Sequence, residues 1–137
     1  MRDFTYVCPL RTTRVVSAHR TDIYFVRVML GLSWLTESWN VNQSPPGGLL
    51  RFELLRGPPD DEKQPFYVKT YFESQTMEQQ RSATPLTPPQ LPDRVFVAIP
   101  TCSDGPENSC PFEAFKALAL RSLDKSCVKT VPVDTLE

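Results

Sequence analysis

The chain has 137 residues, of which 40% are hydrophobic and 10% aromatic, as expected for a single domain with a moderate core. Its net charge of −1 lacks the basic excess that is typical of nucleic-acid-binding proteins. The longest apolar run, residues 23–32, contains Arg27 and is about half as long as a bilayer-spanning helix. We therefore expect neither a nucleic-acid partner nor a membrane partner.

The N-terminal residues 1–13 form an undefined segment without a recognisable pattern. This segment carries Asp3 and lacks a continuous apolar stretch, so it does not have the features of a secretory signal.

The only histidine of the chain, His19, follows a short apolar stretch. The β-branched pair Val15-Val16 predicts a buried strand over residues 14–17, and Thr21-Asp22 predicts the start of a helix. His19 would then lie in a strand-to-helix turn, where the ligand crevice of an open α/β sheet is found. A purely structural histidine is the alternative interpretation.

The first predicted helix covers residues 21–32. Its apolar positions go nearly all the way round, which predicts burial on most sides with Arg27 at the edge. Gly31 is a plausible end signal. The loop that follows contains Trp34 and Trp39, which we interpret as core and loop packing residues.

A turn over residues 44–48, with two prolines and two glycines, leads into two strand-like runs. The runs, 49–56 and 66–72, are joined by the charged loop 57–65 and predict an antiparallel pair. One face of the pair should pack and the other should meet water. The packing positions are Phe52, Leu54, Val68 and Thr70, and the solvated positions are Arg51, Glu53, Lys69 and Tyr71.

The second half of the chain begins with a short helical or extended piece at 77–81 and a proline-rich surface loop at 84–92, where a polyproline ligand motif is the alternative. A strand is expected at 94–100. A helix is expected at 111–120, capped by Ser109 or Cys110 and apolar on one face. That face would carry Phe112, Phe115, Leu118 and Ala119.

The chain has four cysteines, at positions 8, 102, 110 and 127. Cys102 and Cys110 bracket a turn-forming segment, a natural place for a small disulfide loop, and disulfides indicate an oxidising compartment. There is no CxxC pair and no second histidine, so we expect no metal site.

An ordered set of motifs resembles the C-terminal part of the histidine acid phosphatases, and within them the bacterial periplasmic phytase and glucose-1-phosphatase group. The set consists of Val15-Val16-Ser17-Ala18-His19, the apolar helix, Trp39-Asn40-Val41, Pro45 to Glu53, Cys102, Cys110 to Phe115, and Cys127. It covers residues 14–128 and leaves 129–137 as a tail. The resemblance implies an α/β fold, a partial histidine-phosphatase (phosphoglycerate-mutase-like) fold with a mixed sheet and flanking helices.

The resemblance also implies a reaction, the hydrolysis of phosphomonoesters through a phosphorylated histidine, with no cofactor. In the family the nucleophile lies in an Arg-His-Gly-x-Arg-x-Pro motif, which this chain does not contain. His19 matches instead the second histidine, which binds the phosphoryl oxygens. With Arg20 and Thr21 it would hold an anion at the start of a helix.

A second departure lies next to that histidine. The family has an aspartate there that protonates the leaving alcohol, whereas this chain has Arg20, which cannot donate a proton at any working pH. Asp22 would share a face with His19 if the turn is helical, and it is the candidate replacement. The candidate catalytic residues are therefore His19 and Asp22, while Arg20 would favour binding over turnover.

The resemblance matches Cys102 and Cys110 to a small family disulfide and Cys127 to a cysteine that bridges to an upstream region. Cys8 has no counterpart, so it either pairs with Cys127 or remains a free thiol.

The sequence thus predicts a fragment of an acid phosphatase or phytase-like hydrolase, weakly active or inactive alone, that takes a phosphomonoester or inorganic phosphate. The missing N-terminal part of the enzyme would be a further partner. The family implies a periplasmic or secreted location. The alternatives are a non-catalytic phosphate-binding or interaction module and a hydrolase of unfamiliar mechanism.

Overall fold

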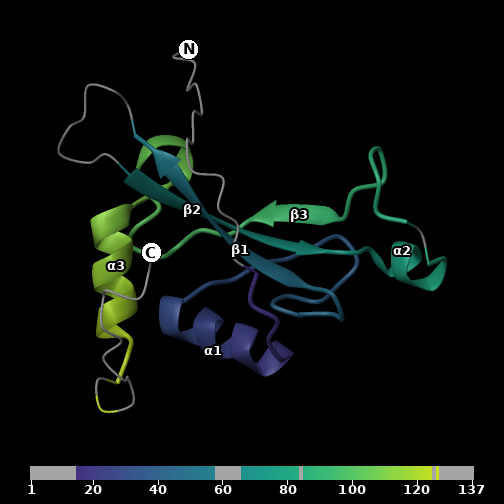
Figure 1. The fold of residues 1–137 in the computed structure, drawn as a ribbon, viewed down its shortest axis with the longest axis horizontal. Helices are drawn as coiled ribbons and strands as arrows, with labels where there is room; N and C mark the ends of the chain where they lie inside the picture. The colour runs from purple at the N-terminus through teal and green to yellow at the C-terminus, as the bar shows by residue number, and fades with distance from the viewer. Residues whose placement is uncertain (1–14, 58–65, 84, 125, 127–137) are drawn as a thin grey trace.

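The computed structural model describes residues 15–57, 66–83, 85–124 and 126, and Figure 1 shows their arrangement. Two longer helices flank a small sheet, so the expected α/β class with flanking helices is confirmed. The elements in chain order are α1 (Arg20–Leu30), β1 (Leu49–Arg56), β2 (Phe66–Ser74), α2 (Met77–Arg81), β3 (Asp93–Phe96), the short 3₁₀ helix η1 (Pro106–Asn108), β4 (Cys110–Pro111) and α3 (Phe112–Arg121). The expected segment 1–13, the tail 129–137, Cys8 and Cys127 lie outside the described residues.

The strand β2 is the centre of the sheet. It pairs with β1 along one edge and with β3 and β4 along the other. All of these pairs are antiparallel, so among the described strands the sheet is antiparallel and not mixed as expected. Phe52 lies opposite Thr70 and Leu54 opposite Val68, so the predicted antiparallel pair is confirmed. The proline-rich stretch that precedes β3 contains neither helix nor strand among its described residues, as expected.

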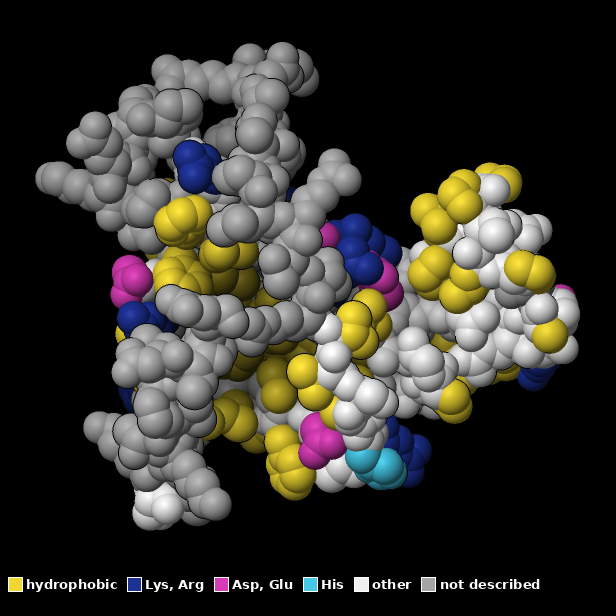
Figure 2. Space-filling model, viewed as in Figure 1, with side chains coloured by type: hydrophobic (Ala, Val, Ile, Leu, Met, Phe, Trp, Pro, Cys, Tyr) yellow, Lys and Arg dark blue, Asp and Glu magenta, His cyan; other side chains and the backbone are white. Residues whose placement is uncertain are grey.

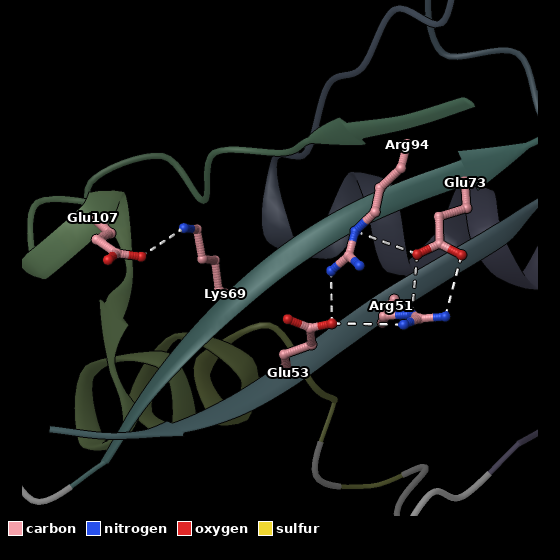
Figure 3. A network of polar contacts seen from close by, with 6 residues as sticks. All are labelled: Arg51, Glu53, Lys69, Glu73, Arg94 and Glu107. Atoms are coloured by element: carbon pink, nitrogen blue, oxygen red, sulfur yellow. Dashed lines mark hydrogen bonds and ion pairs between the residues drawn. The ribbon is translucent and has the colours of Figure 1, made fainter. Parts of the chain in front are cut away.

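On β2 the two faces of the sheet differ as the alternation predicts, since Val68, Thr70 and Phe72 are buried in the core. On the edge strand β1 the prediction is wrong, because Phe52 and Leu54 are 39% and 50% exposed while Arg51 and Glu53 are half-buried. An edge strand has a neighbour on one side only, so less of its surface is covered. The other face carries a network of ion pairs, which Figure 3 shows from close by. Its contacts are Arg51 Nε to Glu73 Oε1 at 3.2 Å, Arg94 Nε to Glu73 Oε1 at 3.4 Å and an Arg94 guanidinium nitrogen to Glu53 Oε1 at 2.6 Å.

The core joins the sheet to the extended segment that follows α1. Leu32, Trp34 and Thr36 alternate inward along this segment and are all buried. The Trp34 ring stacks on Phe72 with 4.5 Å between ring centroids, and its Nε1 donates to the carbonyl of Gln43 at 3.1 Å. The predicted packing role of the tryptophans is confirmed for this residue.

The helix α1 ends where Gly31 takes a left-handed conformation, with φ of 66°, so the predicted end signal is correct. The prediction of burial on most sides is wrong. Phe25 is 62% exposed and Val28 is 70% exposed, while Ile23 and Val26 pack partly against the core. A helix buries only the stripe that faces other protein, and within the described residues α1 has packing partners on one side only.

The predicted buried strand at residues 14–17 is also wrong. Its described residues belong to no helix or strand, and Val15 and Val16 are 78% and 84% exposed. A strand needs the backbone of a neighbour to pair with, and none of the described strands pairs with this segment. β-Branched residues alone therefore did not decide its structure.

Two element boundaries, the end of β3 and the start of α3, differ from those that the sequence predicts. The expected strand 94–100 ends at Phe96, although Val97 and Ile99 remain buried beyond it. The helix α3 begins at Phe112 and takes Pro111 as its N-cap without a side-chain cap, so capping by Ser109 or Cys110 is wrong. The reason is that Cys110 and Pro111 pair with β2 as the strand β4.

The predicted apolar face of α3 packs against the core, with the rings of Phe115 and Phe52 at 5.6 Å between centroids. The C-terminal end of α3 is bonded to α1, because the hydroxyl of the C-cap Ser122 donates to the Met29 carbonyl at 2.8 Å. The predicted bond between Cys102 and Cys110 is present as a disulfide, with 4.9 Å between the two Cα atoms.

Candidate functional site

His19 is the N-cap of α1, so its place in a turn before a helix agrees with the sequence, although the strand before it does not form. The residue is exposed, and Figure 2 shows the histidine side chain, in cyan, at the molecular surface. The backbone N–H of Thr21 donates to His19 Nδ1 at 3.3 Å, and the Thr21 hydroxyl lies 2.7 Å from the same nitrogen. Because a backbone N–H can only donate, Nδ1 is an acceptor and the proton of the neutral ring is on Nε2.

Asp22 lies on the same helical face as His19, as the spacing predicts. Its Oδ2 accepts a hydrogen bond from the backbone N–H of His19 at 2.9 Å, so the two residues form a reciprocal cap. The carboxylate is therefore engaged with the backbone at the start of α1.

A pocket of about 280 Å³ opens between the start of α1 and the turn at residues 44–48. One wall is formed by the end of the extended segment and the first turn of the helix, and the other by the turn. The lining residues are Ala18, His19, Arg20, Ile23, Ser44, Pro45, Pro46, Gly47 and Gly48. Thr21 and Asp22 are not among them, so the pocket contains two of the four predicted site residues.

The turn that forms the second wall is fixed by close packing. The Gly48 N–H donates to the Pro45 carbonyl at 2.9 Å. A Cβ on Gly48 would lie 3.0 Å from Phe72 Cζ, so the turn packs closely against the core of the sheet. The Ser44 N–H donates to the Tyr24 hydroxyl at 3.5 Å, which links the turn to α1.

The charges around the pocket favour an anion. The N-terminus of α1 carries the positive end of the helix dipole, and Arg20 adds a full positive charge to the pocket lining. The opposite charge of Asp22 lies in the same turn but outside the lining. Within the described part of the chain, no three His, Cys, Asp or Glu side chains come together as a metal ion would require. Among the same residues, no helix has the length and apolarity to cross a membrane.

The sequence pointed to the first wall of this pocket and missed the second. The residues 44–48 stood out as a turn, yet they lie far from His19 along the chain and nothing in their spacing tied them to it. The signal that singled them out was the Pro-Pro-Gly-Gly run, to which we assigned no role in a site.

Comparisons with known proteins give matches among solved structures. No protein-family model and no curated protein matches the chain. The phytase of Hafnia alvei in its apo form matches 84% of this chain with 33% identity and a TM-score of 0.70, and the chain spans 27% of that protein. The same phytase has also been solved with myo-inositol hexakis sulphate, and this structure matches 83% of the chain.

Two further phytases have the same fold over a similar stretch. The enzyme from Citrobacter braakii gives a TM-score of 0.72 at 24% identity, and the enzyme from Klebsiella sp. ASR1 gives 0.63 at 26% identity. The chain covers 28% of each. The chain thus spans about a quarter of the length of the phytases it matches.

Proposed function

Because the chain is related to the bacterial phytases, which are histidine acid phosphatases, we propose that it forms part of a phosphomonoesterase and binds the phosphoryl group in the pocket at the start of α1. The observation that carries this proposal is that His19 and Arg20 line one pocket at a helix N-terminus. Such a pocket supplies hydrogen-bond donors and positive charge to the oxygens of a phosphate ester.

In this proposal His19 donates from Nε2 to a phosphoryl oxygen. The contacts of Thr21 with Nδ1 fix the ring in the tautomer that this needs. Thr21 therefore acts by holding His19, and Arg20 neutralises the charge of the bound group. The substrate class is a phosphomonoester, with inorganic phosphate as the product that the same contacts would hold.

Turnover by this chain alone is expected to be weak or absent. The chain has one histidine, and a mechanism that needs a nucleophilic histidine beside a second, phosphate-binding one cannot run on it. Asp22 is the candidate proton donor, yet its carboxylate accepts from the His19 backbone and does not line the pocket. We propose that residues 14–128 correspond to the C-terminal portion of the family domain, and that the missing N-terminal part would complete the site.

The same observations favour a second candidate, a non-catalytic phosphate-binding or interaction module. An arginine where the family has its acid strengthens anion binding and removes a proton donor. We further propose a periplasmic or secreted location, because the disulfide between Cys102 and Cys110 suits an oxidising compartment.

The test combines turnover with binding. The oxidised chain and His19→Ala are compared in the hydrolysis of p-nitrophenyl phosphate between about pH 3 and pH 7. Binding of inorganic phosphate is measured by titration calorimetry for both and for Arg20→Ala, with the exposed Arg81→Ala as the matched control. We expect no turnover above that of His19→Ala, and phosphate binding that both pocket variants weaken and Arg81→Ala leaves unchanged.

Two results would count against the proposal. If the wild-type chain binds no phosphate, the pocket is not a phosphoryl site. If its turnover is substantial and vanishes in His19→Ala, the chain has a complete catalytic set and the expectation of weak activity is wrong.

A further inference from the structure

Ser44 is a buried residue in the wall of the pocket. The residue is only 5% exposed and yet belongs to the pocket lining. Its Oγ lies 3.1 Å from the position that a Cβ would take on Gly48, another lining residue. The backbone N–H of Ser44 contacts Tyr24, whereas no described residue donates to or accepts from the hydroxyl.

The Ser44 hydroxyl is not among the fully buried side-chain atoms that lack a partner, so it keeps accessible surface although the residue as a whole is buried. Ser74 provides an internal comparison, because it is 2% exposed and its hydroxyl is fully buried without a partner among the described residues. Ser74 is not part of the pocket lining. Of these two serines, Ser44 is therefore the one that a molecule in the pocket could reach.

The turn offers few other donors to the pocket. Pro45 and Pro46 have no N–H, and the N–H of Gly48 already donates to the Pro45 carbonyl at 2.9 Å. The hydroxyl of Ser44 and the N–H of Gly47 are the donors that remain on this wall. Opposite them lie His19 and Arg20, so an anion in the pocket would meet donors on both sides.

We propose that Ser44 is a further binding residue of this site, whose hydroxyl donates a hydrogen bond to an oxygen of the phosphate group held by His19 and Arg20. This inference rests on the proposed function, since the ligand is the phosphoryl group of a phosphomonoester or inorganic phosphate. Ser44 would then place the phosphate against the turn as well as against the helix. The hydroxyl has no protein partner among the described residues, so it is available to the ligand.

The experiment is titration of the 137-residue chain and its Ser44→Ala variant with inorganic phosphate, with Ser74→Ala as the matched control. We expect phosphate to bind Ser44→Ala about tenfold more weakly, the typical effect of losing one hydrogen bond to a charged group. Ser74→Ala should bind phosphate as the wild type does. Thermal denaturation without phosphate should give Ser44→Ala a melting temperature no lower than that of the wild type, because the hydroxyl has no partner to lose.

Each other outcome overturns the inference. Phosphate binding by Ser44→Ala at wild-type affinity, while Arg20→Ala is weakened, refutes the role of Ser44 and leaves the proposed function standing. An equal loss in Ser44→Ala and Ser74→Ala, or a lower melting temperature of Ser44→Ala alone, indicates a structural role for the serine. No phosphate binding by the wild-type chain refutes both the inference and the proposed function.

Discussion

Gly48 joins the pocket to the core, and Gly48→Ala tests that connection. The new Cβ would lie 3.0 Å from Phe72 Cζ and from the Pro45 carbonyl oxygen, and 3.1 Å from Ser44 Oγ. Two carbon atoms pack best at about 3.5–4.0 Å, so the substitution overfills the site. Phe72 has little room to yield, because it is 0% exposed and stacks on Trp34.

We expect Gly48→Ala to lower the free energy of unfolding by about 1–3 kcal/mol, the usual cost of an added methyl group in a packed core. For a chain of this size the melting temperature should fall by roughly 3–10 °C. Urea unfolding followed by tryptophan fluorescence measures the free energy directly. An unchanged free energy of unfolding in Gly48→Ala would refute the close packing described here.

The neighbouring Gly47 gives a control with a different physical cause. Its φ is +75° and the nearest atom to an added Cβ is Gln75 Oε1 at 4.0 Å, so Gly47→Ala suffers backbone strain of about 1–2 kcal/mol and no crowding. Asparagine tolerates this conformation, so Gly47→Asn should lose less stability than Gly47→Ala. At position 48 asparagine should be at least as harmful as alanine, and a rescue by Gly48→Asn would contradict the steric explanation.

Three further predictions concern the remaining parts of the fold. Reduction of the bond between Cys102 and Cys110 should lower the free energy of unfolding by about 2–3 kcal/mol through the entropy of the freed loop, as melting with and without reductant would show. The substitution Glu73→Gln should cost about 1 kcal/mol or less, since its two arginine pairs are partly exposed, and urea unfolding should show that this loss shrinks at high salt. The Ser126 hydroxyl, and to a smaller extent its backbone N–H, donate to the Asp124 carboxylate and lower the pKa of that group. This contact therefore stabilises the folded chain at a pH above the pKa that Asp124 has in the unfolded chain, and the stabilisation is lost as the pH falls through the pKa of Asp124 in the folded chain. Ser126→Ala should therefore raise the pKa of Asp124 in an NMR titration, and an unmoved pKa would assign the shift to another cause.

The parts of the fold that the sequence predicted correctly depend on short-range signals. The hairpin of β1 and β2 follows from alternation and from the turn before it, and Gly31 ends α1 through its own backbone conformation. The wrong predictions depend on partners elsewhere. Val15 and Val16 are exposed because no described strand pairs with them, and α3 starts late because Cys110 pairs with β2.

The same distinction between short-range signals and distant partners applies to the candidate site. The reciprocal cap between His19 and Asp22 is a local arrangement, and the spacing in the sequence predicted that the two residues share a face. The same proximity gives the Asp22 carboxylate a backbone partner, which spacing alone did not reveal. Ser44 reaches the site only because the chain turns back after α1 and its N–H meets Tyr24 on that helix. A local sequence pattern can thus predict the residues of one wall of the pocket. The residues of the opposite wall, and the hydrogen-bond partner of each polar side chain, depend on how the whole chain packs.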